Sequence, residues 1–129
     1  LFRSAERIIT DLRKAGARIS LDDFGTGQSS LGRLRDFTFD KVKIDRAFVS
    51  RITSDRASGH IVRAIIAMCD GLELEVVAEG IEQPEEAEML RSLGCAMGQG
   101  YYHGRPADTA STLRYLSTHH RDFMTPERD

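Results

Sequence analysis

A regular alternation of four short apolar segments with longer intervals of helical periodicity constrains this chain most. The strand-like segments span residues 17–22, 40–45, 75–79 and about 96–101. Because a strand, a helix and a second strand in succession form a βαβ unit, this order predicts a parallel sheet of four strands.

The polarity of alternate residues in these strands predicts how the sheet is used. With a period of two, Asp22, Lys43, Glu79 and Gln99 lie on the polar face, near the carboxyl ends of their strands. Active sites of α/β barrels lie at this edge. A doubly wound sheet also binds ligands there but covers both faces with helices, so one polar face favours a barrel interior.

Helical patterns accompany the strands. We expect a first helix that stops at Gly16 and has Ile8, Ile9 and Leu12 on one face, and a later helix that begins at Pro84. The last helix is expected to have Asp108 as its N-cap and to bury Leu113 and Leu116.

Composition limits the partners. Eighteen basic and twenty acidic residues give a formal charge of −2, which favours neither a nucleic-acid polymer nor a membrane surface. A signal peptide and an apolar stretch of about 20 residues are both absent from the sequence, so we expect a cytoplasmic segment, within a parent that could carry a membrane anchor. Residues 1–116 are expected to form one domain, and residues 117–129 a polar tail.

Two adjacent carboxylates, Asp22 and Asp23, end the first predicted strand. Adjacent carboxylates repel each other, so their placement indicates a bound cation. Gly25 and Gly27 follow and let the backbone approach a ligand closely. The alternative is a solvated turn at a helix start, although capping needs only one acid.

Lys43 and the two glutamates of segment 79–82 also have two interpretations each. Lys43 could stabilise developing charge near the carboxylates, or be an ordinary strand lysine. Glu79 is the better candidate for chemistry, whereas Glu82 could merely cap the helix that begins at Pro84.

Six short motifs occur along the chain: Leu-Asp-Asp-Phe-Gly-Thr-Gly (21–27), Val-Lys-Ile-Asp-Arg (42–46), Val-Ala-Glu-Gly-Ile-Glu (77–82), Gly-Cys (94–95), Gln-Gly-Tyr (99–101) and Arg-Pro (105–106). Together they are similar to the EAL-domain cyclic di-GMP phosphodiesterases. The resemblance implies a TIM-like barrel, of which these four βα units form about the C-terminal half. It also implies a bacterial signalling hydrolase that opens cyclic di-GMP to linear pGpG with Mg²⁺ or Mn²⁺.

The resemblance also implies roles for individual residues. It makes the two carboxylates of the first strand metal ligands, one of them shared by two metals, and the lysine and first glutamate catalytic. The second glutamate anchors the loop after the first strand, and the glutamine and loop residues form the rim of the site. The metal ligands are Asp22 and Asp23, the catalytic residues are Lys43 and Glu79, and the loop anchor is Glu82. The rim residues are Gln99, Gly25, Thr26 and Gly27.

The Glu-Ala-Leu motif that names the family does not occur among the 129 residues. We therefore expect the N-terminal half of the domain to be a partner of this segment, and the isolated segment to be inactive. Sensory or GGDEF domains of the parent are further candidate partners. One alternative is an inactive module that binds cyclic di-GMP or another protein, and a homodimer through the open strand edges is another.

Overall fold

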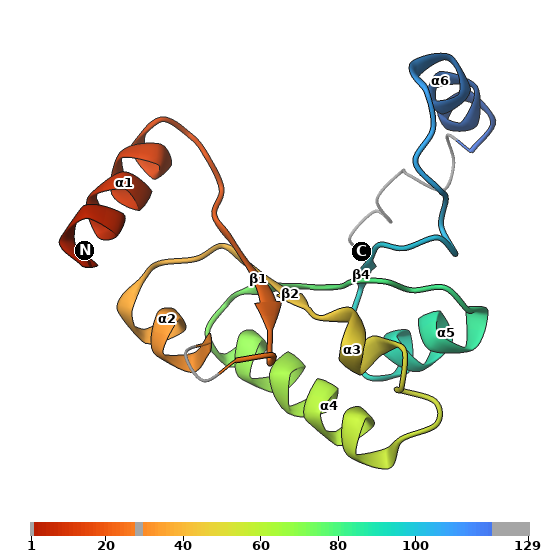
Figure 1. Ribbon diagram of the computed structural model, residues 1–129, viewed down its shortest axis with the longest axis horizontal. Helices are drawn as coiled ribbons and strands as arrows, with labels where there is room; N and C mark the ends of the chain where they lie inside the picture. The colour runs from red at the N-terminus through yellow and green to blue at the C-terminus, as the bar shows by residue number, and fades with distance from the viewer. Residues whose placement is uncertain (1, 28–29, 120–129) are drawn as a thin grey trace, which may run out of the picture.

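One parallel sheet forms the centre of the structure, a computed structural model that describes residues 2–27 and 30–119. Its strands follow one another in chain order, so each is hydrogen-bonded to the next one along the sequence (Figure 1). This arrangement confirms the predicted parallel α/β sheet. The strands are β1 (Ser20–Phe24), β2 (Lys41–Ile44), β3 (Glu75–Ala78) and β4 (Met97–Gly98).

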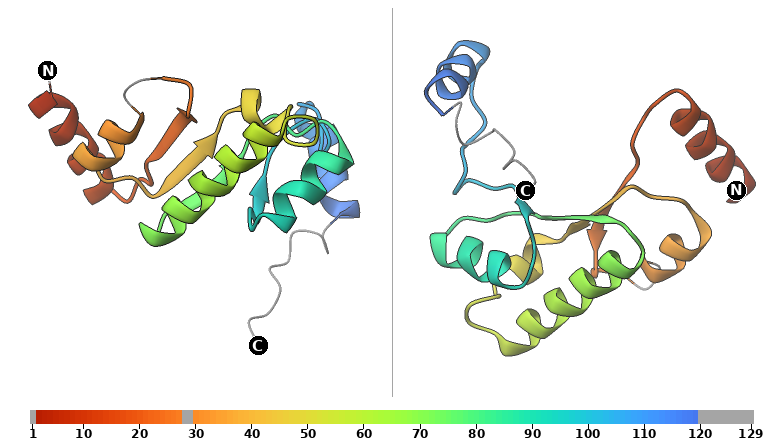
Figure 2. Two further views of the ribbon diagram at one scale, coloured as in Figure 1. Left: turned by 90° about the horizontal axis from the view of Figure 1, so that it is seen from below. Right: turned by 180° about the vertical axis from the view of Figure 1, so that it is seen from behind.

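Helices cover one side of this sheet. The elements α2 to α5 lie together on that side, whereas α1 and α6 project away at opposite ends (Figures 1 and 2). Within the described part of the chain, every helix is too short or too polar to cross a bilayer. The helices are α1 (Phe2–Lys14), α2 (Ser30–Asp36), α3 (Arg46–Val49), α4 (Arg56–Gly71), α5 (Pro84–Ser92) and α6 (Thr109–Thr118).

Short polar side chains fix where several helices begin. Asp55 accepts hydrogen bonds from two backbone N–H groups of the first turn of α4, and Asp108 accepts one from Ser111 at the start of α6. The predicted cap of the last helix is therefore confirmed. Pro84 opens α5 as predicted, because its fixed φ suits the first helical turn and its missing N–H is not needed there.

The hydrophobic core lies between the sheet and helices α3 to α5. Helix α4 packs on β2 and β3 and also contacts α3. Val42 and Ile44 point into this core with no exposed surface, whereas their neighbour Lys43 is on the opposite face. The remaining core residues are Leu21, Phe24, Val49, Ile52, Val62, Ile65, Cys69, Ala78, Ile81, Ala87, Leu90 and Cys95.

The predicted burial of Leu113 and Leu116 in the last helix was wrong. Leu113 and Leu116 of α6 are 62% and 44% exposed, and Ile8 and Leu12 of α1 are exposed as well. Both helices stand away from the sheet, so their apolar faces do not join the core (Figure 1). Amphipathic periodicity shows that a face can be buried but not what buries it.

Element bounds also differ from those predicted. β1 begins three residues later than the predicted segment and continues to Phe24, and β4 has only two residues. The short helix α3 was not predicted. Helix α6 extends past the predicted boundary at residue 116, and residues 120–129 of the predicted tail lie outside the described residues.

Asp40 attaches α1 and the segment before β1 to the start of β2. Its Oδ2 accepts a hydrogen bond from Ile19 N–H at 2.7 Å and one from Arg13 Nη1 at 2.6 Å. The pKa of Asp40 is lowered, first by the Ile19 N–H and then by the Arg13 guanidinium. This one carboxylate therefore fixes the entry into the first strand.

Asp40→Asn is expected to lower the free energy of unfolding of the complete domain at neutral pH. Because the folded-state pKa is below the unfolded value, this stabilisation is complete above the unfolded pKa and is lost as the pH falls through the folded one. Urea unfolding at pH 7 and at pH 3 should therefore show a difference between variant and parent that shrinks in acid. The control is Asp36→Asn, because among the described residues Asp36 forms its ion pair with its exposed neighbour Arg35 alone. An equal effect of the two variants contradicts the assignment.

Candidate metal centre

A β-bulge places two carboxylates opposite one lysine. Leu21 pairs with Val42 and Phe24 pairs with Ile44, so β1 has two residues, Asp22 and Asp23, where β2 has only Lys43. Asp23 has a φ of 53°, in the left-handed region that Asp tolerates better than most residues. The bulge keeps both flanking apolar side chains in the core and leaves both carboxylates at the carboxyl edge.

Lys43 connects the carboxylates of two strands. Its Nζ forms an ion pair with Glu79 Oε1, directly after β3, and lies 3.8 Å from Asp22 Oδ2. Gln99, directly after β4, donates a hydrogen bond from Nε2 to the same Glu79 oxygen at 3.0 Å. The structure thus brings together the four residues that strand alternation placed on one face.

The carboxylates form a compact group. One carboxylate oxygen each from Asp22, Asp23 and Glu79 lie within 4.8 Å of one another. The pKa of Asp22 is lowered, chiefly by the N–H of Asp23, which donates to its Oδ1 at 2.8 Å, and further by the charge of Lys43. The pKa of Asp23 is raised, first by the charge of Asp22.

Asp45 is a fourth acid at this edge, which the sequence analysis did not identify. It is the N-cap of α3, where its Oδ1 accepts from Ala47 N–H at 2.7 Å. Its carboxyl group also raises the pKa of Asp23. A capping Asp has a sufficient structural reason, so only its position directly after β2, two residues beyond Lys43, could have indicated a second role.

The two partners of the ion pair between Lys43 and Glu79 differ in how strongly each favours its charged form. Hydrogen bonding to Glu79 raises the pKa of Lys43, so the ammonium form is strongly favoured. The pKa of Glu79 is also raised, because its burial and the nearby Asp22 carboxylate outweigh the effect of Lys43. One ammonium group therefore does not neutralise the three carboxylates, and the site favours an additional cation.

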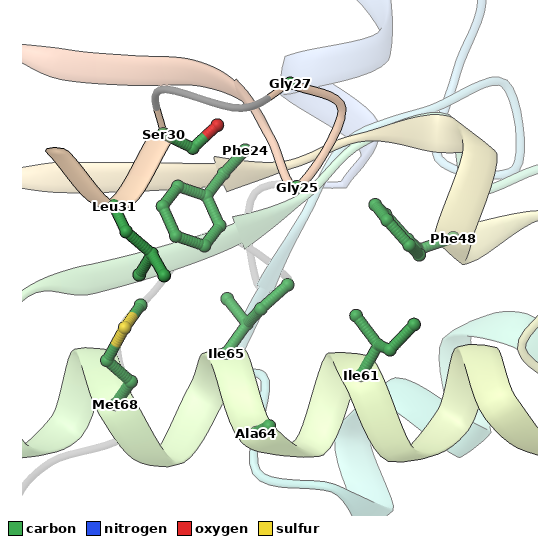
Figure 3. A pocket seen from close by; sticks show the side chains of 10 residues that line it. All are labelled: Phe24, Gly25, Gly27, Ser30, Leu31, Phe48, Ile61, Ala64, Ile65 and Met68. Carbon is green, nitrogen blue, oxygen red and sulfur yellow. The ribbon is translucent and has the colours of Figure 1, made fainter. Parts of the chain in front are cut away.

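The loop after Asp23 folds back on it. Thr26 Oγ1 and the Thr26 backbone N–H both donate to the Asp23 carbonyl, at 2.8 and 3.3 Å. Gly25 has a φ of 99° and lies against the ring of Phe48, whereas a Cβ on Gly27 would have no atom of residues 2–27 or 30–119 within 4 Å. Of the predicted rim residues in this loop, Thr26 and Gly25 thus shape the turn after Asp23, and Gly27 lines the pocket that Figure 3 shows.

Glu82 does not cap α5. The capping carboxylate is that of the buried Glu86, which accepts from the backbone N–H groups of Glu82 and Gln83 at 2.8 and 3.1 Å. The side chain of Glu82 instead pairs with Arg46, with 2.7 Å between Oε1 and Nη2. The alternative interpretation of Glu82 as a helix cap was therefore wrong, and its predicted role as a loop anchor stays a prediction.

The donor set suits a hard divalent cation. Mg²⁺ and Mn²⁺ prefer carboxylate oxygens, and the three acids that converge here come from the bulged end of β1 and from the residue directly after β3. Glu79 N–H donates to Ile44 O at 3.1 Å, and Gln99 N–H donates to Ala78 O at 2.9 Å. Asp22 and Asp23 would hold such an ion, with Glu79 beside it.

Comparison with known proteins assigns this arrangement to a family. A family model described as "EAL domain" matches residues 2–106. A signalling protein of Caulobacter vibrioides is 50% identical over 111 residues, covering 83% of this chain and 14% of that protein. The cyclic di-GMP phosphodiesterase NbdA of Pseudomonas aeruginosa is 40% identical over 121 residues, covering 94% of this chain and 16% of that protein. The chain therefore spans about one sixth of the length of these relatives.

A solved structure agrees with the sequence comparison. The manganese and cyclic di-GMP complex of Klebsiella pneumoniae BlrP1 superposes with a TM-score of 0.78 at 36% identity, over 83% of this chain and 27% of that one. The family match covers most of this chain, and the four parallel strands correspond to part of the TIM-barrel fold of EAL domains. The chain belongs to the EAL domain family and constitutes a partial EAL domain.

Proposed function

We propose that this chain supplies, at the carboxyl edge of its sheet, about half of an active site that hydrolyses cyclic di-GMP to linear pGpG in bacterial signalling. In this reaction one phosphodiester P–O bond breaks, water supplies the new oxygen on phosphorus, and the leaving ribose oxygen takes a proton. The observation that carries the proposal is the convergence of Asp22, Asp23, Lys43 and Glu79 at one sheet edge. Relatives named as cyclic di-GMP phosphodiesterases support the substrate.

Asp22 and Asp23 are the proposed ligands of Mg²⁺ or Mn²⁺. When bound, such an ion supplies positive charge to the phosphate and acidifies a water molecule. Asp22 suits this role because its lowered pKa keeps it ionised, and Asp23 because an added cation relieves its repulsion from Asp22. The manganese in the BlrP1 complex supports a divalent ion in an EAL domain.

Lys43 and Glu79 are the proposed catalytic residues. Lys43 is held as an ammonium between Asp22 and Glu79, where it can orient the attacking water and offset charge that develops on the phosphate. Glu79 has a raised pKa, which suits it to accept a proton from that water. Gln99 holds the Glu79 carboxylate in place through its amide and forms the rim of the site.

Lys43→Met is expected to lower kcat by about 10²–10³-fold in the complete EAL domain, because it removes a charge positioned for the transition state. The assay follows conversion of cyclic di-GMP to pGpG by chromatography with Mn²⁺ present. Lys43→Arg retains the charge and should recover part of the rate. Wild-type kcat in the methionine variant would contradict the role of Lys43. A wild-type domain that binds cyclic di-GMP without cleaving it would instead favour the sensor alternative.

Asp23→Asn is expected to raise the Tm of the complete domain when divalent ions are chelated. The pKa of Asp23 is above its ordinary value, so its ionised form destabilises the fold at neutral pH, and this penalty disappears as the pH falls below the pKa. Asn also tolerates the positive φ of this position. Adding Mn²⁺ should then raise the Tm of the parent more than that of the variant.

The control for this experiment is Asp11→Asn, which makes the same change in charge on the exposed surface of α1. It should alter neither the Tm in chelator nor the gain with Mn²⁺. A lower Tm of Asp23→Asn in chelator would contradict the repulsion between Asp22 and Asp23. An equal gain with Mn²⁺ in variant and parent would exclude Asp23 as a metal ligand.

A further inference from the structure

We propose that Arg46 is a positioning residue that couples the two loops bearing the carboxylates, through the single turn of helix α3. The first loop is defined as residues 22–27, the bulged end of β1 with Asp22 and Asp23 together with the turn that follows it, and the second is residues 79–82, which begins with Glu79. The consequence for catalysis rests on the proposed function. The coupling is a property of the fold and is measurable without substrate.

The amino end of α3 contacts the second loop at two points. Arg46 Nη2 lies 2.7 Å from Glu82 Oε1, and the aliphatic part of Arg46 lies against the backbone of Gly80. A Cβ on Gly80 would lie 2.8 Å from Cβ and from Cδ of Arg46, and Gly80 has a φ of 71°. Because Gly80 directly follows Glu79, Arg46 occupies the space beside the backbone that orients this carboxylate.

The other end of α3 contacts the first loop. A Cβ on Gly25 would lie 2.6 Å from Cε2 of Phe48, and Gly25 is the second residue after Asp23. Figure 3 shows the Phe48 ring next to Gly25 and above Ile61 of α4. The following residue, Val49, has no exposed surface. The ring therefore lies between the loop and α4, where a shift of α3 would displace the loop.

Helix α3 is short and well fixed, so it can transmit such a shift. It has four residues, is separated from β2 by Asp45 alone, and is capped by that residue, whose own carboxyl group acts on Asp23. A single capped turn has few internal dihedral angles that could absorb a displacement. Movement at Arg46 is thus expected to reach Phe48 and then Gly25.

The ion pair of Arg46 contributes little to global stability. The side chains of Arg46 and Glu82 are 65% and 41% exposed, and exposed pairs have small effects on unfolding. A positioning role and a purely structural role therefore predict different results. The first predicts a local change in the loop with an unchanged Tm, and the second predicts a change in Tm or no change at all.

A second ion pair in the chain provides a matched control. Arg18 Nη2 lies 3.0 Å from Glu75 Oε2, with side chains 62% and 42% exposed, almost the same exposure as in the Arg46 pair. Arg18 precedes β1 and Glu75 begins β3, so this pair lies at the opposite end of the strands from the carboxylates. Arg18→Met and Arg46→Met each remove one exposed ion pair and retain an unbranched side chain.

The experiment compares these two variants and Arg46→Lys in the complete EAL domain. Hydrogen exchange of the amides of residues 24–27 is measured without metal, and the Kd for Mn²⁺ is measured by calorimetry. Arg46→Met should speed the exchange and weaken Mn²⁺ binding by about two- to fivefold, the range that corresponds to one exposed ion pair. Arg46→Lys should recover part of both, and Arg18→Met should change neither.

Unchanged exchange in Arg46→Met would overturn the proposal, as would equal changes in Arg46→Met and Arg18→Met. The exchange result is independent of the proposed function. If the wild-type domain neither binds Mn²⁺ nor cleaves cyclic di-GMP, the proposed function fails, while faster exchange confined to Arg46→Met still supports the coupling through α3.

Discussion

The bulge in β1 determines the geometry of the whole carboxyl edge of the sheet. A regular strand would direct Asp22 and Asp23 to opposite faces, so one carboxylate would enter the apolar core beneath the sheet. Two residues opposite Lys43 avoid this cost, because Leu21 and Phe24 both remain buried on the helical side. The result is a concentration of negative charge that one ammonium group cannot neutralise.

The core holds this unfavourable charge arrangement in place. Val42 and Ile44 are fully buried on either side of Lys43, so β2 cannot slip without exposing them. The loop after β3 is similarly fixed, because the buried Glu86 accepts from two of its backbone N–H groups. Apolar packing beneath the sheet therefore maintains carboxylates above it in positions that they would not adopt by themselves, which is the preorganisation that a metal site needs.

Much of this site could be predicted from strand periodicity. Alternation of polar and apolar residues placed Asp22, Lys43, Glu79 and Gln99 at one edge, and the ion pairs and hydrogen bonds among them agree with that prediction. The bulge could not be predicted, because alternation assumes a regular ladder. Asp45 was missed because its capping role already accounts for an Asp at that position.

The exposure of the last helix could not be predicted for another reason. Leu113 and Leu116 follow a helical period that is typical of a packed face, but the structure leaves them exposed. The sequence of an amphipathic helix specifies which face is apolar, whereas burial depends on the tertiary neighbour that is present. The same limit applies to α3, whose single turn is too short to produce a periodic signal.

The central claim is that the carboxylates of the bulge hold a divalent cation. A crystal structure of the complete EAL domain grown with Mn²⁺, with anomalous data collected near the manganese edge, tests it most directly. The account predicts an anomalous peak within about 2.0–2.3 Å of carboxylate oxygens of both Asp22 and Asp23. Well-ordered carboxylates with no peak beside them, and Lys43 as their only cationic neighbour, would contradict it.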